Sequence, residues 1–80
     1  MIGAMTLPEA ILVAQIGERW VASLDGVMLD FQRHRSEVIG HAVATASQMA
    51  GRGATVEVIV QNGRERYTVW NSAQDGFVKA

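Results

Sequence analysis

Three short turn signals constrain the fold of this chain more than any other feature. They are Gly17-Glu18, Asp25-Gly26 and Asn62-Gly63. Each stands between two runs rich in apolar and β-branched residues, and loops of this length and composition join neighbouring antiparallel strands. The runs cover residues 11–16, 19–24, 27–32, 54–61 and 64–70. The sequence therefore predicts a three-stranded meander in the first half of the chain and a separate hairpin in the second half.

The turns also predict which side chains share a face of the sheet. Because a two-residue loop fixes the pairing, Ile16 is expected opposite Arg19, and Trp20 opposite Phe31. In this register one face of the meander carries Ile11, Val13, Trp20, Ala22, Leu24, Val27, Leu29 and Phe31. The apolar face of the later hairpin carries Val56, Val58, Val60, Tyr67 and Val69, with Trp70 on the other side. The pair of Trp20 and Phe31 is expected to anchor the core, since aromatic pairs bury a large area in a fixed geometry.

One amphipathic helix is predicted between the two halves, over residues 36–51. Its apolar side chains recur with the helical period and form one continuous arc. The arc consists of Val38, Ile39, Ala42, Val43, Ala46, Met49 and Ala50. Ser36 is expected to cap the first turn, Glu37 suits the positive end of the helix dipole, and Gly51 is expected to end the helix in the left-handed conformation.

The order of elements predicts the fold class. Three strands, one helix and two strands leave two apolar sheet faces to share a single apolar helix face. An α+β fold follows, a two-layer sandwich in which one helix covers one face of a mainly antiparallel βββαββ sheet. Residues 11–70 are the single expected domain, because a chain of 80 residues builds one core. Residues 1–10 and 71–80 are expected to be flexible tails.

The composition disfavours several classes of function. The chain has no cysteine, so disulfides and thiolate metal sites are excluded. Its two histidines, His34 and His41, are too few for a histidine-only zinc site, and neither a metal nor a cofactor is expected. A formal net charge of −1 disfavours non-specific binding to nucleic acid or to a membrane surface. Without a charged leader or an apolar run long enough to span a bilayer, the chain is expected to be cytoplasmic.

No catalytic constellation is visible in the sequence. The carboxylates are scattered over the predicted elements, which leaves no acid pair for glycosidase-like or metal chemistry. The serines stand outside any nucleophile-elbow context. His41 is expected to contact Glu37, one helical turn earlier, as a solvated pair. The sequence therefore predicts a protein that is not an enzyme.

A basic run before the predicted helix is the first candidate contact surface. Arg33, His34 and Arg35 lie where the free amides and the dipole of the helix favour an anion such as phosphate or carboxylate. The alternative is a solvated turn, which is the usual role of charges in loops. Arg64 and Arg66 would enlarge the basic surface if the last hairpin lies near the start of the helix.

The back of the predicted meander is the second candidate surface. It carries five apolar residues, although a solvated sheet face should be mostly polar. They are Leu12, Ala14, Ile16, Val21 and Met28. With Ile59 and Trp70 they would form a patch of several hundred Å², a size that usually marks an interface. The sequence therefore predicts an interaction module that self-associates as a homodimer, with an unidentified protein partner as a further possibility. The alternative is that strand twist and the two tails cover the patch within one chain.

The motifs resemble those of a family of small bacterial domains of unknown function. The resemblance rests on G-x-x-W at Gly17 and Trp20, D-G at Asp25, the alanine-rich helix, G-x-x-V-x-V from Gly53, and N-G-R from Asn62. It implies the same architecture and carries over no site residues. The run of three strands and a helix is also similar to HicB-type antitoxin domains. That similarity implies a toxin partner. A separate alternative from the residues themselves is a small regulator that contacts nucleic acid, another anion or a toxin through Arg33, Arg35, Arg64 and Arg66.

Overall fold

The structure is a computed structural model that describes residues 9–74. Its elements are β1 (Glu9–Ile16), β2 (Arg19–Leu24), β3 (Val27–Gln32), α1 (Arg35–Gly51), β4 (Val56–Asn62) and β5 (Glu65–Asn71). The predicted tails lie outside the described residues at 1–8 and 75–80. Glu9 and Ala10, which were assigned to the first tail, belong to β1. After β5, the amide of Ser72 donates to the carbonyl of Val56 at 2.9 Å, so the second predicted tail began too early.

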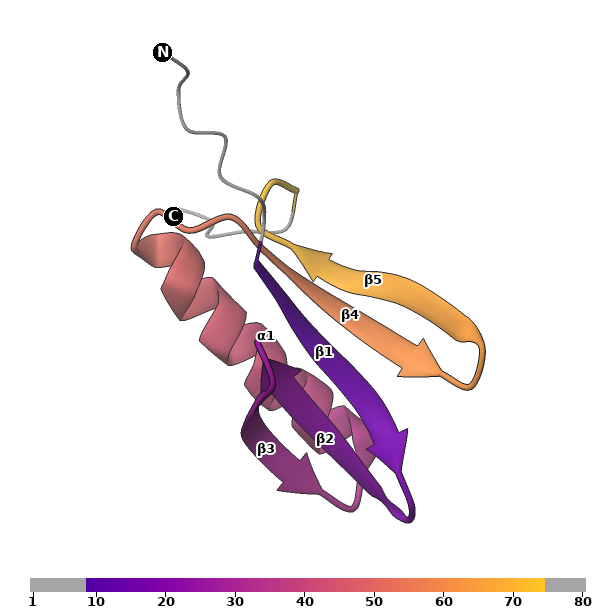
Figure 1. Cartoon of the computed structure of the whole chain (residues 1–80). Coiled ribbons are helices and arrows are strands. Elements are labelled where there is room, and N and C mark those ends of the chain that lie inside the picture. The colour runs from indigo at the N-terminus through magenta and orange to yellow at the C-terminus, as the bar shows by residue number, and fades with distance from the viewer. Residues whose placement is uncertain (1–8, 75–80) are drawn as a thin grey trace.

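The five strands form one mixed sheet in the order β3-β2-β1-β4-β5 (Figure 1). Three of the neighbouring pairs are antiparallel, and the central pair of β1 and β4 is parallel. The parallel pair arises because α1 runs back along one face of the sheet before the chain enters β4 (Figure 1). No turn signal joins β1 to β4, so the sequence could not predict this strand order.

One helix packed on one face of the sheet confirms the predicted α+β sandwich. The core between the two layers contains Ile11, Val13, Ala22, Val38, Ala42, Ala46, Val56, Val58, Val60 and Trp70. The small side chains of Ala42 and Ala46 let α1 approach the sheet closely. The remaining apolar residues of the predicted helix arc, Ile39, Val43, Met49 and Ala50, are partly buried against this core, so the predicted arc is confirmed.

The register between β1 and β2 is confirmed over the whole strand, whereas that between β2 and β3 is confirmed only next to the turn. Asp25 and Gly26 both have positive φ, 51° and 82°, as a type I′ turn requires, and Leu24 pairs with Val27. A bulge then makes Leu29 an extra residue, so Ala22 pairs with Asp30 and Val21 with Phe31. The predicted pair of Trp20 and Phe31 is therefore wrong.

The last hairpin differs from the prediction in two ways. Asn62 pairs with Glu65, so the turn residues are Gly63 and Arg64, one position later than expected. A second bulge, at Val69, places Trp70 opposite Val58 on the helix side of the sheet. Trp70 is buried there with 9% of its surface exposed, and its predicted position on the back of the sheet is wrong.

The first residue of α1 and its C-terminal cap differ from the prediction. The helix begins at Arg35, and its N-cap residue His34 makes no capping bond through its side chain, so Ser36 lies inside the first turn. At the other end, the left-handed residue is Gly53, with φ +99°, and not Gly51. The amide of Gly53 donates to the carbonyl of Ala50 and that of Ala54 to the carbonyl of Met49, which is the Schellman arrangement.

Candidate functional site

The face of the sheet turned away from α1, called the open face below, gathers the apolar residues that the sequence assigned to an interface. Strand alternation sets this face, because Ile11 and Val13 point under the helix and their neighbours point away. Leu12, Ala14 and Ile16 come from β1, Val21 from β2, and Met28 from β3. With Phe31 and Ile59 they form the apolar patch of the open face.

The apolar patch is exposed most strongly toward the β1–β2 turn and the β3 edge. Ile16 has 65% of its surface exposed, Met28 58% and Phe31 46%. Leu12, Ala14, Val21 and Ile59 are half-buried by one another and by their neighbours. Sequence reasoning missed Phe31, because the bulge at Leu29 reverses the face on which it lies. The same reasoning included Trp70, which the second bulge removes from this face.

Polar groups border the apolar patch at both ends of the open face. On β2, the guanidinium of Arg19 lies over the Phe31 ring, with Cζ 5.2 Å from the ring centroid. Toward β5 the face is polar, since Thr68 pairs with Ile59 and its hydroxyl lies 3.5 Å from Glu57 Oε1. The apolar patch is therefore bordered by charged and hydroxyl groups, as interface patches commonly are.

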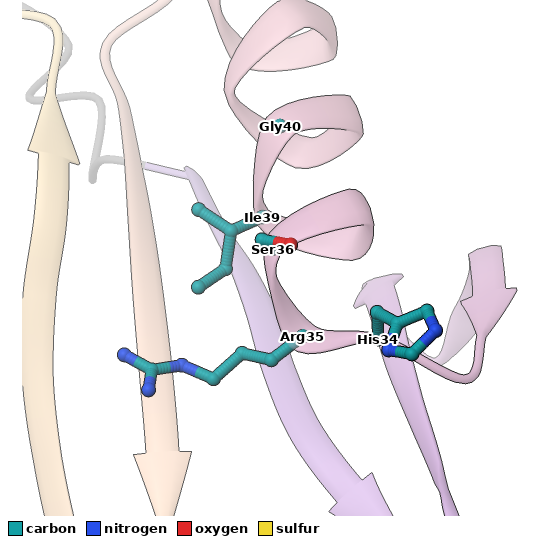
Figure 2. Close-up of a pocket in the computed structure, with 5 residues that line it drawn as sticks. All are labelled: His34, Arg35, Ser36, Ile39 and Gly40. Atoms are coloured by element: carbon teal, nitrogen blue, oxygen red, sulfur yellow. The ribbon is translucent and has the colours of Figure 1, made fainter.

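The basic run does not converge on one point. Arg33, His34 and Arg35 are all exposed, and the side chains of His34 and Arg35 extend in opposite directions from the start of α1 (Figure 2). Arg35 reaches toward β5, where Nη2 donates to Tyr67 Oη at 2.8 Å, and its Cζ lies 5.9 Å from the Trp20 ring centroid. Two aromatic residues thus hold one guanidinium in place on the helix side of the sheet.

A shallow hollow lies beside this guanidinium. It has a volume of about 570 Å³ and is lined by His34, Arg35, Ser36, Ile39 and Gly40 (Figure 2). Tyr67 brings the last hairpin close to Arg35, but Arg66 pairs with Gln61 and faces the open side, and Arg64 lies in the turn. Arg66 therefore does not extend the basic surface around Arg35, because the two side chains lie on opposite faces of the sheet.

An acid–histidine pair joins α1 to the edge strand β3. His41 Nδ1 lies 3.0 Å from Asp30 Oδ2, and Gln32 Nε2 donates to Asp30 Oδ1 at 3.0 Å. Burial by itself would raise the pKa of the Asp30 carboxyl. The hydrogen bonds from His41, Gln32 and the Phe31 backbone, together with the charge on His41, outweigh burial and lower that pKa. Sequence reasoning paired His41 with Glu37 from their spacing of one helical turn, and it placed Asp30 on the other face of β3.

The described residues give few other indications of function. Residues 9–74 contain no group of three histidine, aspartate or glutamate side chains placed to hold a metal ion. No helix among them is long and apolar enough to cross a membrane. Comparison of the chain with protein-family models, curated proteins and solved structures finds no match. The open face, the hollow and the Asp30–His41 pair are the features of residues 9–74 that bear on function.

Proposed function

We propose that this protein is a non-catalytic interaction module that self-associates through the open face of its sheet. The observation that carries the proposal is the exposure of Ile16, Met28 and Phe31 on the same face of the sheet. A solvated face of an antiparallel sheet is normally polar, and large exposed apolar patches usually mark interfaces. Burial of such a surface is favourable by roughly 25 cal/mol per Å².

A second copy of the chain suits this surface. The patch lies on a sheet, and two such faces can pack about 10 Å apart with their strands nearly aligned. A two-fold axis would place the same patch on both sides, which is the commonest way to close a homodimer. The charged groups at the border, Arg19 and Glu57, would stay near solvent at the rim.

Sedimentation equilibrium of the purified protein tests the proposal. The wild type is expected to dimerise, and the Ile16→Lys, Val21→Glu double variant to sediment as a monomer, because dimerisation would remove two charged side chains from water. Gln15→Lys is the matched control, since Gln15 is an exposed neighbour on β1 that points to the helix side. A wild-type monomer at every accessible concentration would overturn the proposal, as would equal dimerisation of the double variant.

A second candidate function is anion binding near the start of α1. Its support is the placement of Arg35 between Trp20 and Tyr67 beside the hollow, with Arg33 and His34 close in sequence. A small regulator similar to the HicB-type domains would use this surface for phosphate groups. Titration of the ¹⁵N-labelled protein with inorganic phosphate and with a short oligonucleotide at low salt tests it. Unchanged amide resonances at residues 33–40 would contradict this candidate.

A further inference from the structure

The sequence pattern and the structure disagree about β3 by one register step. Continuous pairing with β2 would place Leu29 and Phe31 under α1 and leave Asp30 and Gln32 on the open face, which suits their polarity. In the structure, the bulge at Leu29 puts Asp30 opposite Ala22 and Gln32 opposite Trp20, so both polar side chains face the helix. We call these arrangements the continuous register and the bulged register.

Two contacts depend on the bulged register. Asp30, with 12% of its side chain exposed, is paired with His41 at 3.0 Å. On the opposite face, Arg19 lies over Phe31. In the continuous register, Asp30 would move to the open face, diagonally across from Arg19, and Phe31 would lie opposite Trp20. Each register thus offers partners to the same side chains.

The start of α1 can accommodate the change. Removal of the bulge lengthens the connection between β3 and the helix by one residue. The former bulge residue itself supplies the added length, so α1 can keep its first residue, Arg35, and the contacts of Arg35 with Tyr67 and Trp20.

We propose that β3 has two registers and that the contact between Asp30 and His41 selects the bulged one. A carboxylate held against the helix is stable only while it is paired, since a half-buried charge without a partner is costly. Loss of the His41 contact therefore favours the continuous register, in which the Asp30 carboxylate reaches solvent.

The register also regulates self-association, a consequence that rests on the proposed use of the open face. The bulged register presents Phe31 on the apolar patch. The continuous register withdraws Phe31 and places Asp30 and Gln32 beside Val21 instead. Only the bulged register is therefore competent to dimerise.

The His41→Ala variant tests the selection, with Gln48→Ala as the matched control on the exposed side of α1. Alanine is the best helix former, so both variants are expected to fold. Cross-strand nuclear Overhauser contacts report the register, because Phe31 faces Val21 in the bulged register and Trp20 in the continuous one. We expect the wild type and Gln48→Ala to show the Val21 contact, and His41→Ala to show the Trp20 contact with at least tenfold weaker dimerisation.

Deletion of Leu29 in the His41→Ala background supplies the second measurement. Without the extra residue, continuous pairing itself places Asp30 under the helix and Phe31 outward, so the deletion is expected to restore the Val21 contact and dimerisation. Retention of the Val21 contact alone in His41→Ala would overturn the register selection, whatever the oligomeric state. A change of contact with no wild-type dimer would instead support the selection and overturn the proposed function.

Discussion

At the scale of single residues, Asp30 is the most informative position in the chain. Its carboxyl lies on the helix side of an edge strand and is held by His41 and Gln32. These contacts favour the charged form and lower the pKa of Asp30 from its ordinary value of 3.8, although burial opposes them. The same residue thus links helix packing, strand register and the response of the fold to acid.

The lowered pKa of Asp30 predicts a specific loss of stability in acid. A carboxyl whose pKa is lower in the folded than in the unfolded state contributes stability that is present above the unfolded value, here 3.8. The contribution is lost as the pH falls through the folded pKa. The free energy of unfolding, measured in urea by tryptophan fluorescence, should therefore fall below about pH 4.

In Asp30→Asn this part of the acid loss should be absent, because the amide does not titrate. Asp25→Asn, in an exposed turn, serves as the control. Its free energy of unfolding should fall at low pH as that of the wild type does. An equal loss of unfolding free energy at low pH in the wild type and in Asp30→Asn would contradict the prediction.

At the scale of elements, the two bulges explain most of what sequence reasoning could and could not predict. Turn chemistry correctly gave the Asp25-Gly26 hairpin and every pair between β1 and β2. A bulge adds one residue without a clear local signal, and each residue beyond it changes face. Phe31 and Trp70 both follow bulges, which is why one was wrongly placed in the core and the other on the open face.

The second bulge makes a prediction about stability. Trp70 is buried against α1, whereas the bulged residue before it, Val69, is 36% exposed. Trp70→Ala should lower the free energy of unfolding by about 3–5 kcal/mol, the usual cost of removing a buried aromatic side chain. Val69→Ala should cost less than about 1 kcal/mol, since surface positions contribute little. Urea unfolding followed by circular dichroism measures both, and equal losses would show that the face assignment of β5 is wrong.

At the scale of the whole molecule, the fold has more apolar surface than one helix can cover. The helix buries a single face of a five-stranded sheet, and the core residues from the four strands β1, β2, β4 and β5 all point to that face. A chain of 80 residues buries a smaller fraction of its surface than a larger domain does, so its stability alone is expected to be marginal. Pairing of two open faces would add a second core, so stability and self-association are expected to be linked.

This linkage predicts that the thermal midpoint of unfolding depends on protein concentration. For a dimer that unfolds to two chains, each tenfold rise in concentration contributes about 1.4 kcal/mol per dimer to the folded state. In a domain of this size, each kcal/mol of added stability raises the thermal midpoint by several degrees. Thermal unfolding curves recorded over a hundredfold range of protein concentration should therefore have clearly different midpoints. The Ile16→Lys, Val21→Glu variant should have a midpoint independent of concentration, because pairing of two open faces would then remove charged side chains from water. A wild-type midpoint that is equally independent of concentration would mean that the apolar patch of the open face remains solvent-exposed in the native protein.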